Sequence, residues 1–150
     1  MKLVVIDGQS GRTGALLVER IRAAGLPLEL LAVGTNAIAT AAMMKAGAQR
    51  GATGENPVLV ACRDADIIAG PIGILMADAL MGEITPAMAV AVGQSRAQKV
   101  LLPVNSTAAR SWSASVTWPS PRSWMRRWKS CGNCAVCPRS RSEQRTQKSA

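Results

Sequence analysis

The 150-residue sequence contains no histidine and no tyrosine. A histidine general base is therefore excluded, and so is the Tyr-x-x-x-Lys pair of short-chain dehydrogenases. No run approaches the ~18 apolar residues that a membrane-spanning helix needs. The four apolar residues before Asp7 are too few for the core of a secretory signal peptide. We therefore expect a cytoplasmic protein whose cysteines are reduced thiols or metal ligands.

Leucine, isoleucine and acidic residues are nearly confined to the first two thirds of the chain. Residues 1–105 carry nine Lys or Arg against eight Asp or Glu, whereas residues 106–150 carry nine against the single Glu143. The net charge of +9 therefore belongs almost entirely to the tail, which also lacks Leu and Ile and holds all four Trp. This composition predicts one folded domain over 1–105 and a basic, disordered tail over 106–150.

Short apolar runs alternate with helical patterns over the first 105 residues. This alternation predicts an α/β fold, a Rossmann-like parallel sheet flanked by helices. Residues 50–57 are interpreted as a glycine-rich loop, and residues 58–65 fit either a strand or a short helix. The expected strands are 2–8, 26–34, 66–71 and 99–105, and the expected helices are 11–25, 35–47, 72–82 and 85–98.

The strongest chemical motif is the glycine-rich sequence DGQSGRTG after the first strand. Its glycines suit a tight turn at Gly8, close approach of a phosphate at Gly11 and close packing of helix on strand at Gly14. Amides at the start of the following helix would face an anion. Alternatively, the glycines only shape the turn. The residues predicted to bind a nucleotide here are Asp7, Gly8, Gln9, Ser10, Gly11, Arg12, Thr13 and Gly14.

The end of the second strand gives a weaker signal, because no carboxylate stands there for an adenosine ribose. Gly34, Thr35 and Asn36 occupy the position, and the hydroxyl and amide could bond a ribose. No Arg or Lys is present to favour a 2′-phosphate. NAD, NADP, another nucleotide and a phosphorylated metabolite therefore all remain open as ligands.

Other candidate side chains have simpler explanations. Asp7 either contacts a ligand or a metal, or bonds backbone amides of the turn. Cys62 lies in an apolar run and is expected to be a small buried hydrophobe. Four further charged residues lie near helix ends or loops and are expected to be solvated surface charges: Lys45, Glu55, Asp78 and Glu83.

Several stretches together resemble a family of small bacterial proteins known as domain of unknown function 3842. These are VVIDGQSGRTG, residues 30–56, residues 66–89 and KVLLPVN, so the resemblance covers about residues 2–105. It implies a Rossmann-like domain and assigns no reaction. Family members continue with an apolar strand and a final amphipathic helix, so their absence here implies that both are lost.

The tail contains two patterns that usually indicate a site. Cys131, Cys134 and Cys137 follow C-x-x-C-x-x-C, but iron–sulfur clusters take four thiolates and a zinc site also lacks its fourth ligand, so no metal is expected. Basic residues interleaved with Trp could bind nucleic acid, although a tail of charge +8 would bind polyanions non-specifically in any case.

A shift of reading frame explains the tail better. Moving each codon back by one base turns every Trp and Cys codon into one for Leu, Val or Met. The same shift forces Asp at Met125, Glu at Lys129 and Leu at Cys134. These forced residues suit an amphipathic helix. We therefore interpret 106–150 as translated out of frame, and a stop codon in the shifted frame of the DNA would refute this.

The leading functional hypothesis is a nucleotide- or dinucleotide-binding domain of the NAD(P) type, with any chemistry dependent on a second subunit or on the lost C-terminus. No catalytic residue can be assigned. One alternative is a non-catalytic ligand-sensing module on the same fold, and another is nucleic-acid binding through the tail.

Overall fold

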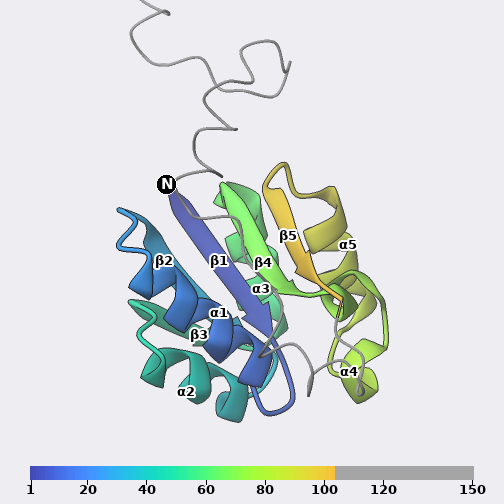
Figure 1. The fold of residues 1–150 in the computed structure, drawn as a ribbon. Coiled ribbons are helices and arrows are strands. Elements are labelled where there is room, and N and C mark those ends of the chain that lie inside the picture. Colours follow the sequence, from blue (N-terminus) through green and yellow to red (C-terminus); the bar gives the residue numbers. More distant parts are fainter. Residues whose placement is uncertain (104–150) are drawn as a thin grey trace, which may run out of the picture. The chain divides into compact units, whose positions relative to one another are not determined.

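The computed structural model describes residues 1–103, which form a five-stranded parallel sheet (Figure 1). The strand order is β3-β2-β1-β4-β5. The chain therefore places β2 and β3 on one side of β1 and then crosses to place β4 and β5 on the other side. The predicted α/β class with a parallel sheet is confirmed. The strands are β1 (Lys2–Asp7), β2 (Glu29–Gly34), β3 (Arg50–Thr53), β4 (Ile67–Pro71) and β5 (Gln98–Leu102).

Strand β1 lies at the centre of the sheet because its side chains are apolar on both faces. It pairs with β2 from Lys2↔Glu29 to Asp7↔Gly34 and with β4 from Leu3↔Ile67 to Val5↔Ala69. Continuous apolar runs of this kind are typical of parallel strands that helices cover on both faces.

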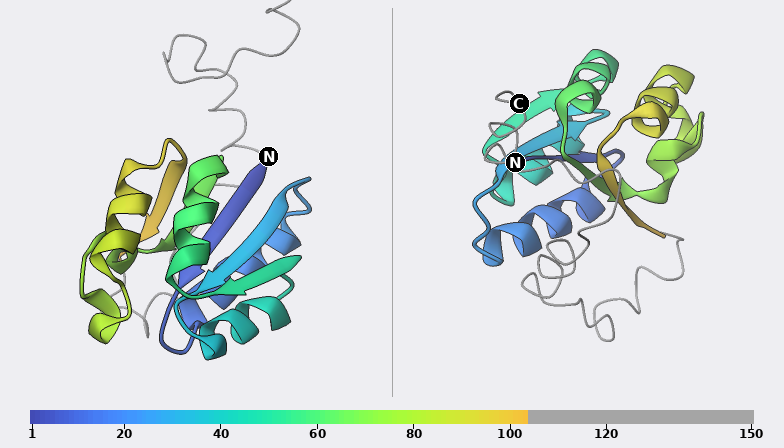
Figure 2. Two further views of the ribbon diagram at one scale, coloured as in Figure 1. Left: turned by 180° about the vertical axis from the view of Figure 1, so that it is seen from behind. Right: turned by 90° about the horizontal axis from the view of Figure 1, so that it is seen from above.

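Helices cover both faces of the sheet (Figure 2). Helices α1 (Arg12–Ala23) and α2 (Ala37–Lys45) pack on one face, and α3 (Glu55–Asp64) and α5 (Pro86–Gln94) pack on the other. Thr85 caps α5 by accepting a hydrogen bond from the Met88 N–H, and proline occupies the first turn. Both features agree with the predicted start of this helix.

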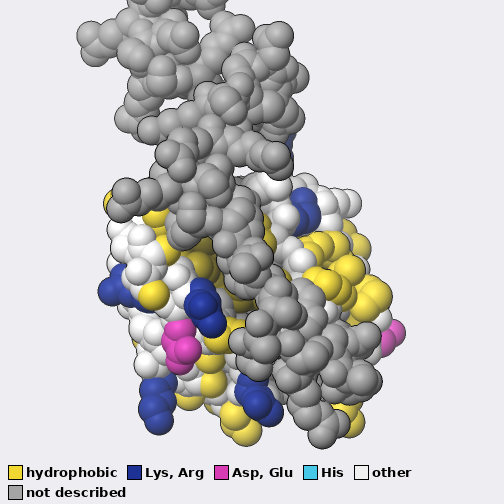
Figure 3. Space-filling model, viewed as in Figure 1, with side chains coloured by type: hydrophobic (Ala, Val, Ile, Leu, Met, Phe, Trp, Pro, Cys, Tyr) yellow, Lys and Arg dark blue, Asp and Glu magenta, His cyan; other side chains and the backbone are white. Residues whose placement is uncertain are grey.

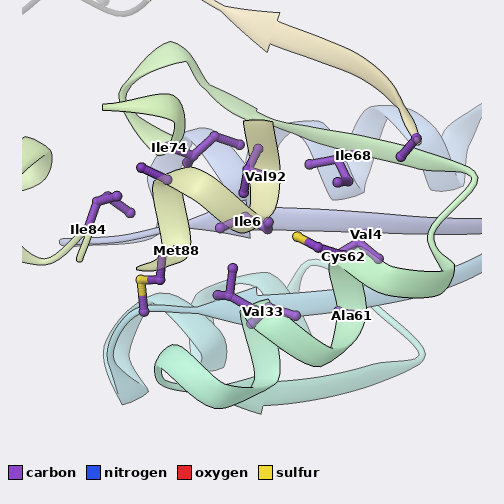
Figure 4. Close-up of a cluster of buried hydrophobic side chains, with 13 residues drawn as sticks. Val4, Ile6, Val33, Ala61, Cys62, Ile68, Ile74, Ile84, Met88 and Val92 are labelled. Carbon is purple, nitrogen blue, oxygen red and sulfur yellow. The ribbon is translucent and has the colours of Figure 1, made fainter. Parts of the chain in front are cut away.

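The largest part of the core lies between the sheet and the α3–α5 layer (Figure 4). Side chains from β1, β2 and β4 meet side chains from the two helices there, and Cys62 is buried among them, as predicted. The strand residues are Val4, Ile6, Val33 and Ile68, and the residues opposite include Ala61, Cys62, Ile74, Ile84, Met88 and Val92.

Two predicted elements were wrong. Residues 50–57 do not form a loop, because Arg50–Thr53 pair with β2 as the short strand β3 and α3 begins at Glu55. Residues 72–82 do not form one helix. They form a 3₁₀ turn, η1 (Ile72–Leu75), and the short α4 (Ala79–Gly82), in which Leu80 and Met81 have positive φ. These left-handed residues prevent the apolar pattern from winding into a continuous right-handed helix.

The predictions of a disordered tail, a lost strand and helix, and a shifted frame lie outside the described residues. Within residues 1–103, β5 is an edge strand, and hydrophobic side chains gather on the side of β5 and α5 (Figure 3). Val90 of α5 is exposed. None of the helices in this described part of the chain is long and apolar enough to cross a membrane.

Candidate functional site

The glycine-rich motif forms the turn between β1 and α1. Gly11 has φ 68° and directly precedes the helix, and its N–H donates to the Gly8 carbonyl at 2.9 Å. A Cβ at Gly11 would lie 2.6 Å from the Ala39 Cα of α2. Gly11 therefore lets α1 start close against α2, and the predicted approach of a phosphate at Gly11 stays a prediction.

Asp7 closes this turn from inside the protein. The residue is only 4 % exposed. One carboxylate oxygen accepts the Gly8 N–H at 2.8 Å, and the other accepts the Gly14 N–H at 2.6 Å. Of the two alternatives for Asp7, the structure therefore shows the bond to backbone amides. Burial raises the pKa of the Asp7 carboxyl, the two amide hydrogen bonds oppose that rise, and the nearby Glu83 adds to it.

A cavity of about 380 Å³ opens beside the turn, at the carboxyl ends of β1 and β4. The strand order reverses between these two strands, and such a switch point is where open α/β sheets bind ligands. From the β1 side it is lined by Asp7, Gly8, Gln9, Ser10, Arg12 and Thr13, and from the β4 side by Pro71, Ile72, Gly73, Met76, Ala79 and Leu80.

The residues after β2 lie beside the turn and are not part of this cavity lining. The Thr35 N–H donates to the Asp7 carbonyl at 3.0 Å, which extends the pairing of β2 with β1. Asn36 caps α2 by accepting the Ala39 N–H at 2.8 Å, and its Nδ2 donates to the Gln9 carbonyl at 3.0 Å. The predicted residues from both strand ends are thus brought together around Gln9.

The side chain of Glu83 completes this group, although no sequence pattern pointed to it. Lys45, Glu55 and Asp78 are exposed as predicted, but Glu83 is half-buried. Its Oε2 accepts hydrogen bonds from the Gln9 N–H at 2.7 Å, from Asn36 Nδ2 at 3.0 Å and from the Thr35 hydroxyl. The prediction that Glu83 is a solvated surface charge was wrong, because the loop after α4 folds back over the β1 turn.

A second hollow, of about 390 Å³, lies where α3 and α5 end, at the amino ends of the strands. Cys62, Arg63 and Arg96 are among its lining residues. Its volume is close to the 380 Å³ of the first cavity, so volume does not decide which of the two binds a ligand. Position favours the first cavity, because ligands of parallel α/β sheets bind at the carboxyl ends of the strands.

A family model described as a domain of unknown function (DUF3842) matches residues 2–116. The match covers more than two thirds of the chain and runs eleven residues beyond Asn105, where the resemblance was expected to end. Comparison with curated proteins and with solved structures finds no match.

Proposed function

The chain belongs to the family described as domain of unknown function 3842, and we propose that it binds a nucleotide or a dinucleotide of the NAD(P) type. The observation that carries this proposal is the position of the cavity. It lies at the switch point of the sheet and is bordered by the glycine turn that opens α1.

The start of α1 supplies the groups that a phosphate needs. The first turn of α1 contains no acidic residue of its own, although the buried Asp7 carboxylate accepts the Gly14 N–H of that turn and takes up one of its amide donors. No group among residues 1–103 accepts the N–H of Ser10 or Arg12. These two amides, the hydroxyls of Ser10 and Thr13 and the exposed Arg12 guanidinium would together hold the phosphate oxygens.

The opposite wall of the cavity suits a flat, weakly polar group. Ile72, Met76 and Leu80 provide apolar surface there, beyond the end of β4. A base or a nicotinamide ring would bury apolar area against this wall while its phosphates lie on the turn. The shape and lining of the cavity therefore favour a nucleotide over a free inorganic anion.

Thermal-shift and calorimetric titrations of the full chain with NAD, NADP and ADP test the proposal. At least one should raise the melting temperature, and Arg12→Ala should weaken its binding by about tenfold through loss of a charge-assisted contact. Arg20→Ala is the matched control, because Arg20 is an exposed arginine of the same helix that does not line the cavity.

High ionic strength screens non-specific attraction of these anions to the basic tail. Under that condition, absence of a shift with all three ligands would refute the proposal. Equal weakening by Arg12→Ala and Arg20→Ala would place the binding elsewhere. Turnover of the reduced cofactor would then distinguish an enzyme from a ligand sensor.

A further inference from the structure

Glu83 places a carboxylate where the sequence showed none, beside the carboxyl end of β2. The residue follows α4, almost fifty positions after Thr35, yet its Oε2 is bonded by donors from both strand ends. The donors are the Gln9 N–H after β1 and the side chains of Thr35 and Asn36 after β2. Three donors of different types therefore hold one oxygen of this carboxylate in place.

Gly8 makes this approach possible. A Cβ at Gly8 would lie 2.6 Å from Glu83 Oε2 and 2.6 Å from Thr35 Oγ1, so a side chain there would require both groups to move. The turn is therefore open at the point where Glu83 crosses it. The first glycine of the motif serves the carboxylate as well as the tight turn that the sequence predicted.

The second oxygen of Glu83 keeps its capacity to accept hydrogen bonds within residues 1–103, at the edge of the turn and outside the lining of the cavity. No residue within 1–103 donates a hydrogen bond to Oε1, and no lysine or arginine of that range forms an ion pair with Glu83. Desolvation alone would raise the pKa of Glu83, but the bonds from Thr35, Gln9 and Asn36 outweigh it and lower that pKa. The group is consequently a carboxylate at neutral pH.

We propose that Glu83 is the ribose-recognition residue of this site and that it selects ligands whose 2′- and 3′-hydroxyls are both free. The inference rests on the proposed nucleotide function. In dinucleotide-binding folds, an acidic residue near the end of the second strand bonds the ribose hydroxyls. Here β2 ends at Gly34 and is followed by Thr35 and Asn36, and Glu83 brings a carboxylate to the same place from the other half of the sheet.

The carboxylate chemistry of Glu83 determines which ribose-containing ligands it favours. A fixed carboxylate accepts hydrogen bonds from hydroxyls and repels a phosphate at the same point. The ligand class is therefore NAD or a ribonucleotide with an unmodified ribose. NADP and 2′-deoxynucleotides should bind more weakly, the first through repulsion and the second through loss of a donor.

The test compares NAD with NADP, and ADP with 2′-deoxy-ADP, on the full chain by calorimetry at high ionic strength. The unmodified chain should bind the first member of each pair at least about tenfold more tightly. Glu83→Gln keeps an oxygen that can accept from Gln9, Thr35 and Asn36, so it should fold and lose most of both preferences. Glu19→Gln removes the same charge from the exposed face of α1 and should change neither.

Each failure has its own signature. If NAD, NADP and ADP all fail to bind, the proposed function itself is refuted. If they bind but both pairs bind equally in the unmodified chain, the role of Glu83 is refuted, and this result does not depend on how the variant folds. Tighter binding of NAD to Glu83→Gln would also overturn it, because Glu83 would then only fill an anion site in place of the ligand.

Discussion

Asn36 joins three parts of the candidate site, and its replacement by alanine should be unusually costly for a half-buried polar residue. Its Oδ1 caps α2 through the Ala39 N–H at 2.8 Å. Its Nδ2 donates at 3.0 Å both to the Gln9 carbonyl and to Glu83 Oε2. Loss of an N-cap costs about 1 kcal/mol. The two remaining bonds, one of them to a carboxylate, add about 1–2 kcal/mol.

Asn36→Ala should therefore lower the free energy of unfolding by about 2–3 kcal/mol. Thr85→Ala is the matched control, because Thr85 caps α5 with one bond to the Met88 N–H at 3.2 Å and no other side-chain bond among residues 1–103. The control should cost about 1 kcal/mol. Far-UV circular dichroism during urea unfolding is the suitable assay, since it follows the helices and strands of residues 1–103 directly.

Asn36→Asp separates the cap from the other two bonds. The carboxylate can still accept the Ala39 N–H, but it donates nothing and stands beside Glu83, so repulsion is added to the lost bonds. Its cost should shrink in the Glu83→Gln background, and a double-mutant cycle measures that coupling. Equal costs for Asn36→Ala and Thr85→Ala, or no coupling to Glu83, would refute the account of this network.

Four further outcomes are expected. Gly14→Ala should lower the free energy of unfolding by about 1–3 kcal/mol, because the new Cβ would lie 2.8 Å from the Cβ of Asp7. A lower melting temperature would report this loss. Met81→Asn should stabilise by about 0.5–1 kcal/mol in urea unfolding, since Met81 has φ 61° and is 93 % exposed, and asparagine tolerates this conformation. Glu83 has a lowered pKa when folded, so its contribution is complete above its ordinary pKa of 4.5 and is lost below it. Acidification from about pH 6 to about pH 3.5 should therefore cost Glu83→Gln less stability than the unmodified chain. Burial raises the pKa of Cys62 to about 11, so with the three tail cysteines replaced by serine the chain should resist thiol reagents at neutral pH until it unfolds.

The sequence was most informative where burial and secondary structure coincide. Strand β1 was predicted because a run that is apolar on both faces is typical of a buried parallel strand. Helix α5 was predicted because Thr-Pro is a typical helix start. Strand β3 carried no such signal. Its residues are mostly exposed and include a glycine, and it exists because its backbone pairs with β2 from Leu31↔Arg50 to Gly34↔Thr53. An exposed edge strand is held by backbone pairing, which does not require a particular pattern of apolar residues.

The candidate site divides in the same way. The glycine turn is local, so its position between β1 and α1 followed from spacing alone, and the hydrogen bonds of Asp7 to its own turn were one of two stated alternatives. Glu83 could not be found by this route. Its partners lie 48 and 47 residues away for Thr35 and Asn36, and the segment that carries it has left-handed residues at Asp78, Leu80 and Met81. No periodic pattern describes such a path.

The two carboxylates of the site limit what can bind there. Asp7 and Glu83 stand on either side of the turn, whereas Arg12 is the cationic side chain lining the cavity. A bare anion would meet more negative than positive charge, so amide donors and Arg12 could hold it only weakly. A ligand that presents hydroxyls to Glu83, phosphates to the start of α1 and a ring to Ile72 and Met76 satisfies each group with its complement. Under the proposed nucleotide function, the two carboxylates therefore predict weaker binding of pyrophosphate than of a nucleotide.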